Sequence, residues 1–302
     1  MDIKGIAFFL GLSFLLVFML TFVLLGEGLL AFRSPSLLQY LLQMLLMGIP
    51  ALAALATGLI HPANETDAKP TLWPVPKGAA LRVLVLPMTL FAVAYGVATV
   101  GGLTVPQWNL AGVLNQVDGI SSRPLQPHVK AIAPFIILGT YPVISMLLGG
   151  TLFAAIALGS EFGWRGYLLP RLMPLGALPA YVLGGLCWGL WFFPFIYGWH
   201  REVGELSGLL GSQMRFIATG IVLSAILGQI KHRTHHLGLC AVALGGVVAQ
   251  ASGIWPHLFQ QASPPWTGPM GWFVIVTLGL SAFVPQLWSS KRSVVVSEID
   301  NE

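Results

Sequence analysis

Charged residues are scarce in this sequence. Only 9% of its 302 residues are Asp, Glu, Lys or Arg, whereas a typical soluble domain has about 25%. Hydrophobic residues make up 56% of the chain and the mean hydropathy is +0.80. This balance excludes a soluble globular protein, and it predicts an all-α membrane protein that crosses the bilayer several times.

Cysteine is also scarce: Cys187 and Cys240 both lie inside apolar stretches. A disulfide framework is therefore not expected. The net charge of +4 is small, and the placement of Lys and Arg around the membrane accounts for it. We therefore expect no nucleic-acid partner. Asn64 begins a glycosylation sequon, but it falls in a loop that we expect to be cytoplasmic.

Apolar runs of about 20 residues, long enough to cross a bilayer, occur repeatedly. They cover residues 6–25, 37–60, 79–100, 131–159, 176–197, 209–230, 237–254 and 269–289. The sequence therefore predicts about eight transmembrane helices. We divide the chain into N-terminal helices and loops over 1–130, a core over 131–254, and a last helix with a cytoplasmic tail over 255–302. The region 101–130 is expected to be a surface loop.

The basic residues predict how the helices are oriented, because cytoplasmic loops carry an excess of Lys and Arg. One side of the predicted bundle holds Lys4, Lys69, Lys77, Arg82, Arg165, Arg171, Lys231, Arg233, Lys291 and Arg292. The other side holds Arg33, Arg123, Lys130, Arg201 and Arg215. This asymmetry places both termini in the cytoplasm.

The stretch Ser160–Leu172, SEFGWRGYLLPRL, brings an acid and two arginines directly after a long apolar run. A carboxylate at membrane depth costs several kcal/mol and requires a partner or a function. Glu161 and Arg165 stand four residues apart, in the order that favours an ion pair on a helix. We therefore expect a structural ion pair between Glu161 and Arg165.

This stretch resembles the first motif, Glu-Glu-x-x-x-Arg, of the CAAX-protease and bacteriocin-processing (CPBP) family. These proteins are type II CAAX prenyl endopeptidase-like intramembrane metalloproteases. Glu161 and Arg165 match the second Glu and the Arg, and the context from Gly166 to Arg171 continues the similarity. Ser160 stands where the family has the Glu that activates water. The resemblance implies a divalent, zinc-like metal as cofactor.

The residues that surround the family's second and third motifs are present, but the polar residues of the motifs themselves are replaced. We call each set of surrounding residues a frame. In the frame WGLWFFP, Phe192 occupies the position of a metal-binding His. In the frame that follows Arg233 and Thr234, Leu244 and Val248 occupy the positions of a His and an Asn. None of these side chains can bind a metal. We therefore expect no metal and assign no catalytic role to the residues at the family positions, Ser160, Glu161, Arg165, Phe192, Leu244 and Val248.

The histidines support the same interpretation, since none lies inside a predicted span. His200 and the pair His235–His236 fall in loops. The charges around His200 are expected to be solvated. The three histidines of the KHRTHH loop form a weak metal pattern, and a basic loop against anionic lipid explains them better.

These observations favour a non-catalytic member of the family. We expect an integral membrane protein, of the bacterial inner membrane by resemblance, that binds a membrane-protein partner or a hydrophobic or lipidated peptide. One alternative is an active intramembrane endopeptidase with a rebuilt site that uses Glu161 with His235 or His236. Another is a transporter of small molecules or lipids, although no pair of interrupted helices is evident.

Overall fold

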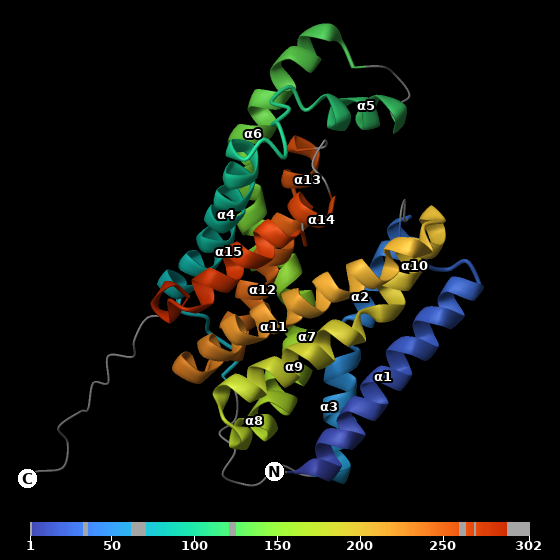
Figure 1. The fold of residues 1–302 in the computed structure, drawn as a ribbon, viewed down its shortest axis with the longest axis vertical. Helices are drawn as coiled ribbons and strands as arrows, with labels where there is room; N and C mark the ends of the chain where they lie inside the picture. Colours follow the sequence, from blue (N-terminus) through green and yellow to red (C-terminus); the bar gives the residue numbers. More distant parts are fainter. Residues whose placement is uncertain are drawn as a thin grey trace, which may run out of the picture.

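The computed structural model describes residues 2–32, 36–61, 71–120, 125–259, 264–268 and 270–288. Throughout these residues the regular structure is helical, apart from an isolated β-bridge between Thr71 and His236. The expected all-α bundle is thus confirmed (Figure 1). Arg33, Lys69, Arg123, Lys291, Arg292 and the sequon at Asn64 lie outside the described residues.

The described residues contain seven helical segments long and apolar enough to cross a membrane. They are Ile3–Gly26, Leu41–Ile60, Lys77–Val100, Pro127–Leu175, Ala177–Val203, Leu206–Thr234 and Leu237–Leu258. About eight were expected. Within the described residues, the eighth run, 269–289, forms helix α15 (Trp272–Ala282) and a short 3₁₀ turn at Pro285–Leu287. At 1.5 Å per residue this helix is about 16 Å long, too short to cross a hydrocarbon core of about 30 Å.

Helix α12 (Leu237–Ala251) is the centre of the bundle, because most of its residues are buried. It packs against α4 (Lys77–Val100), α6 (Pro127–Gly150) and α7 (Leu152–Glu161). Gly245 makes this packing possible: a Cβ at Gly245 would lie 2.2 Å from the carbonyl oxygen of Gly149. Small residues allow two helix backbones to approach this closely.

Helices α9 (Ala177–Trp191) and α11 (Leu209–Thr234) form the most extensive helix pair. A Cβ at Gly185 would lie 2.3 Å from the Cα of Ile221. Glycine is therefore required for the observed helix separation. Between the two, α10 (Phe193–Val203) continues the direction of α9 and contacts α1 (Ile3–Gly26).

The expected single helix over 37–60 is interrupted. Helix α2 (Leu37–Leu46) begins at a capping box made by Ser36 and Gln39, and α3 (Ile49–Ile60) starts afresh after Gly48. Pro50 in the first turn of α3 cannot donate a backbone hydrogen bond, which favours a new helix start. Helix α3 packs on α1 and on the π-helical turn η1 (Phe162–Leu168).

Shorter helices connect these segments. They are α5 (Ala111–Ile120), α8 (Leu169–Leu172), α13 (Trp255–Leu258), α14 (Pro264–Thr267) and the 3₁₀ turns η2 (Met173–Leu175), η3 (Leu206–Gly208) and η4 (Pro285–Leu287). The region 101–130, expected to be a loop, therefore contains helix α5 and the start of α6.

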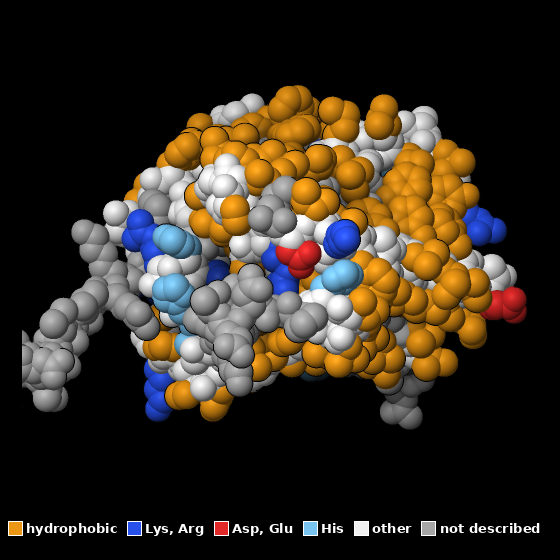
Figure 2. Space-filling view, turned by 90° about the horizontal axis from the view of Figure 1, so that it is seen from below, with side chains coloured by type: hydrophobic (Ala, Val, Ile, Leu, Met, Phe, Trp, Pro, Cys, Tyr) orange, Lys and Arg blue, Asp and Glu red, His pale blue; other side chains and the backbone are white. Residues whose placement is uncertain are grey.

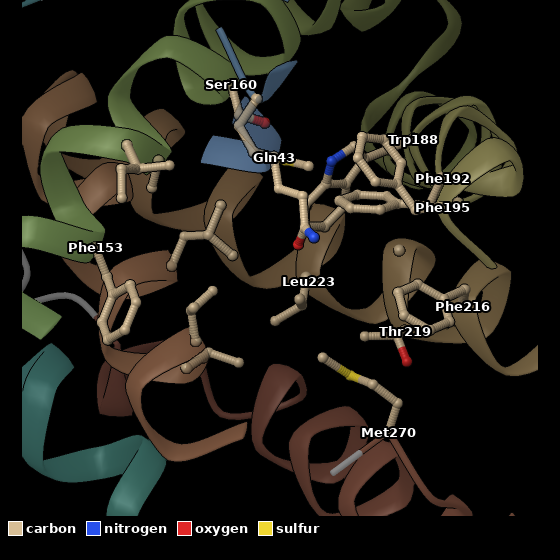
Figure 3. A pocket seen from close by; sticks show the side chains of 18 of the residues that line it. Gln43, Phe153, Ser160, Trp188, Phe192, Phe195, Phe216, Thr219, Leu223 and Met270 are labelled. Carbon is tan, nitrogen blue, oxygen red and sulfur yellow. The ribbon is translucent and has the colours of Figure 1, made fainter. Parts of the chain in front are cut away.

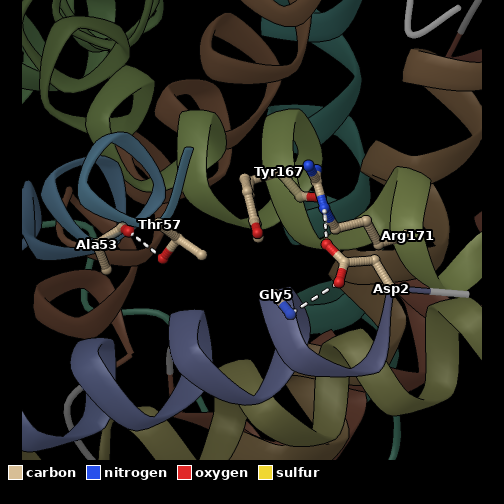
Figure 4. Close-up of polar contacts among 6 residues, drawn as sticks. All are labelled: Asp2, Gly5, Ala53, Thr57, Tyr167 and Arg171. Carbon is tan, nitrogen blue, oxygen red and sulfur yellow. Dashed lines mark hydrogen bonds and ion pairs between the residues drawn. The ribbon is translucent and has the colours of Figure 1, made fainter. Parts of the chain in front are cut away.

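Several segments meet at the end of the bundle where α1 begins. Asp2 caps α1 and lies 3.4 Å from Arg171, at the end of α8 (Figure 4). The ring of Phe8 contacts that of His61 after α3, and Thr71 pairs with His236 at the start of α12. Seen from below, Lys, Arg and His side chains gather across this face, with hydrophobic side chains around them (Figure 2). This grouping agrees with the charge asymmetry, and the cytoplasmic placement of the termini stays a prediction.

Candidate functional site: an apolar cavity beside a buried ion pair

The first motif lies where an α-helix changes into a π-helix. Glu161 is the last residue of α7, and η1 runs from Phe162 to Leu168. The structure places Glu161 Oε1 at 2.8 Å from Arg165 Nη1, with both side chains almost inaccessible at 0% and 2% exposure. Single π-helical turns occur frequently at functional sites. Here the turn holds the pair at the junction of α7 with the segment that leads to α8.

Arg165 has a second contact on the opposite side. Its Cζ lies 4.6 Å from the ring centroid of Trp188 on α9, a cation–π geometry. Glu161 Oε2 and Arg165 Nη2 have no hydrogen-bond partner among the described residues. The guanidinium is therefore held between a carboxylate and an indole, and the pair links α7 and η1 to α9.

A cavity of about 250 Å³ adjoins this pair. All four positions at which the family frames carry a replaced residue line it: Ser160 on α7, Phe192 after α9, and Leu244 and Val248 on α12. In Figure 3, Ser160 and Trp188 lie toward one end of the cavity, and Met270 lies toward the other. Glu161 and Arg165 are not among the lining residues. The fold thus brings together four residues that are up to 88 positions apart in sequence.

The cavity wall is almost entirely apolar. Its polar side chains are Gln43, Ser160, Thr219 and the indole of Trp188. Gln43 Nε2 donates to the Ala31 carbonyl, Thr219 Oγ1 donates to the Arg215 carbonyl, and Trp188 Nε1 has no partner among the described residues. A zinc-like metal needs imidazole, thiolate or carboxylate ligands. The side chains of this wall do not fit such a metal.

No group of three or more His, Cys, Asp or Glu side chains that could hold a metal exists within the part of the chain that the structure describes. His236 caps α12: its Nδ1 accepts from the Leu239 N–H at 3.2 Å, and its Nε2 lies 2.8 Å from the Pro74 carbonyl. His235 ends α11 in a left-handed conformation with φ 53°. Neither histidine lines the cavity.

Phe192 is the centre of an aromatic wall. Its ring centroid lies 5.9 Å from Trp188, 5.8 Å from Phe195 and 5.6 Å from Phe216. Aromatic pairs at such distances add to the stability that burial gives. Phe192, Phe195 and Phe216 also line a second pocket of about 510 Å³.

Sequence reasoning missed two contributions to this region. Gln43 and Met44 of helix α2, and Met47 directly after it, line the cavity, and no motif marks them. His200 was expected in a loop with solvated charges, but it lies in α10 and is only 7% exposed. That expectation is wrong because α10 continues to Val203 and ends at Gly204, whose φ of 72° is a typical C-terminal signal.

The fold and cavity define a helical membrane protein with an apolar chamber among α2, α7, α9, α11 and α12. Residues 140–250 match the family model of type II CAAX prenyl endopeptidase Rce1-like proteins. This part of the chain is therefore an Rce1-like domain, and the resemblance to the CPBP family is confirmed. No curated protein and no solved structure matches the chain.

Proposed function

We propose that this protein is a non-catalytic Rce1-like membrane protein whose cavity binds the apolar part of a membrane ligand, such as a hydrophobic or lipidated peptide. One observation carries the proposal. Ser160, Phe192, Leu244 and Val248 stand at the family's polar positions and line the same cavity. An apolar cavity of this kind excludes a hydrated metal and favours a hydrocarbon chain.

The buried ion pair supports this role. Glu161 is removed from the cavity and engaged by Arg165, which in turn packs on Trp188. Since Trp188 lines the cavity, the pair supports its wall from behind. The alternative of a rebuilt peptidase requires Glu161 to reach a water molecule in the cavity. Its carboxylate would first have to leave Arg165.

Cross-linking with an uncharged alkyl diazirine tests the binding proposal. Purified full-length protein is illuminated with the probe, and modified residues are located by mass spectrometry. We expect labels on cavity residues such as Phe192 and Leu244. Leu244→Trp fills the cavity and should reduce this labelling about tenfold. The matched control Leu280→Trp lies on α15, where Leu280 is 63% exposed, and should leave the labelling unchanged.

Labelling confined to the exposed outer surface of the helices, or equal labelling of the cavity in Leu244→Trp and in the unmodified protein, would refute the proposal. The two variants introduce the same side chain. A difference between them therefore reports the cavity and not a general effect of tryptophan.

A further inference from the structure

A second polar cluster, formed by His200, Ser212 and Arg215, joins α10 to α11. His200 Nδ1 lies 2.7 Å from the Glu205 carbonyl oxygen, and His200 Nε2 lies 2.9 Å from Ser212 Oγ. Arg215 Nη2 donates to Ser212 Oγ at 2.9 Å. His200, Ser212 and Arg215 are therefore linked in a hydrogen-bond network that ends at the Arg215 guanidinium.

The partners of each atom determine which groups donate and which accept in this hydrogen-bond network. A carbonyl oxygen only accepts, so His200 Nδ1 donates to it, and in the tautomer with its proton on Nδ1 the other ring nitrogen, Nε2, is an acceptor. The Ser212 hydroxyl then donates to Nε2, and its oxygen is left to accept from Arg215. The network uses one N–H group of the guanidinium, fixes its orientation and leaves other donors for a ligand.

The charge of Arg215 is uncompensated within the described residues. No carboxylate lies within ion-pair distance of its guanidinium. The nearby acids are engaged or exposed: both carboxylate oxygens of Glu202 accept from the Phe32 N–H, and Glu205 lies exposed at the rim. Arg215 is itself half-buried in the span Leu206–Thr234. A cation in this position needs an anion or water.

The surroundings of the cluster are amphipathic. His200, Ser212 and Arg215 line both the pocket of about 510 Å³ and an outer pocket of about 840 Å³. The first of these pockets has apolar walls that include Phe32, Ile196 and Trp199. It shares Phe192, Phe195 and Phe216 with the central cavity. An oriented cation thus stands at the outer end of a hydrophobic series of pockets.

We propose that these pockets bind an anionic phospholipid, whose phosphate pairs with Arg215 and whose acyl chain lies along the Phe192–Phe216 wall toward the central cavity. The planar guanidinium is suited to bind phosphate through parallel hydrogen bonds. The adjoining apolar walls distinguish a lipid from free phosphate. Trp199, which is 45% exposed, is of the residue type that gathers at headgroup level.

This inference names the ligand class of the proposed function and rests on it, because the acyl chain requires the apolar cavity. Native mass spectrometry of the full-length protein tests the headgroup. Purified protein is supplied with equal amounts of dioleoyl phosphatidylglycerol and dioleoyl phosphatidylcholine. We expect about tenfold more phosphatidylglycerol bound, as one charge-assisted interaction supplies.

Arg215→Gln should remove this preference, Arg215→Lys should keep part of it, and Ser212→Ala should weaken it less than Arg215→Gln does. The matched control is Arg201→Gln, since Arg201 is an exposed arginine of α10, and it should retain the full preference. Equal binding of the two lipids, or an unchanged preference in Arg215→Gln, would overturn the inference. Displacement of phosphatidylglycerol by millimolar inorganic phosphate would also overturn it, because it would identify a free-anion site.

The two proposals fail in different ways. If the uncharged diazirine probe labels the cavity and the lipids bind equally, only the headgroup assignment fails. If the probe does not label the cavity, the proposed function fails, whatever the headgroup preference.

Discussion

Glu161 Oε1 and Arg165 Nη1 lie 2.8 Å apart in an ion pair whose two side chains are buried. Glu161 directly follows Ser160, which lines the cavity. The α-to-π transition at Phe162 sets the direction of this pair. Ser160 lines the cavity, while the adjacent Glu161 carboxylate binds Arg165, whose guanidinium packs on Trp188. One turn of chain thus supplies both the lining of the cavity and the support behind it.

The ion pair makes a direct prediction about stability. Glu161→Gln preserves the size of the side chain but leaves Arg165 as an uncompensated buried charge. Removing one partner of a buried pair costs about 3–5 kcal/mol, so we expect a clearly lower thermal unfolding temperature in detergent. Glu205→Gln, which changes an exposed acid, serves as control and should be close to neutral. An unchanged unfolding temperature in Glu161→Gln would show that the pair does not support the fold.

A second prediction concerns pH and the start of α1 (Figure 4). The pKa of the Asp2 carboxyl is lowered, chiefly because it accepts the Gly5 N–H and also because Arg171 is near. A lowered pKa in the folded state means that Asp2 stabilises the protein above its unfolded pKa of about 3.9. This stabilisation is lost as the pH falls through the folded value.

Comparison of Asp2→Asn with the unmodified protein measures this effect. The asparagine still caps the helix, so the difference reports the charge. Because Asp2 is 39% exposed, we expect less than about 1 kcal/mol at pH 7. The difference in unfolding temperature should shrink over the acidic range below about pH 4, as the Asp2 carboxylate is protonated. A difference that stays constant over this range would contradict the role of the carboxylate charge.

A third prediction tests whether the cavity stands at the family's metal position. The variant Ser160→Glu/Phe192→His/Leu244→His/Val248→Asn restores the family's residue types on the wall. We expect it to bind about one zinc ion per chain, because one carboxylate and two imidazoles then face a single cavity. Phe192→His alone supplies one imidazole and should bind none.

Buried polar groups destabilise an apolar wall, so folding of the restored variant is checked by size-exclusion chromatography and circular dichroism. Phe192→His/Leu244→His provides a second, less disruptive variant. A folded four-residue variant without zinc would show that the positions do not converge closely enough to hold a metal.

The positions of most membrane helices along the chain could be predicted because long apolar runs indicate them directly. The predicted number of about eight spans was less accurate. Hydropathy over 269–289 indicates an apolar region, but helix α15 ends at Ala282 and is too short to cross the membrane. The ion pair followed from the four-residue spacing of Glu161 and Arg165. The resemblance located Ser160, Phe192, Leu244 and Val248 in sequence, while their common cavity depends on close packing of α7, α9 and α12.

Other residues at the cavity and the neighbouring pockets belong to no recognisable sequence pattern. Gln43 in α2 and Met47 in the break before α3 line the cavity, and no sequence motif marks either residue. The His200–Ser212–Arg215 network connects residues on two helices whose distance is set by packing. Gly204 was the available signal that α10 extends past Tyr197, and it would have placed His200 inside the helix.

Metal content tests our proposal that this protein, with its Rce1-like domain, does not carry out metal-dependent catalysis. The full-length protein is purified in mild detergent without chelator, and transition metals are quantified per chain. We expect no metal above the background of the buffer. One equivalent of zinc or a similar ion that Glu161→Ala abolishes would contradict it and would indicate a rebuilt catalytic site.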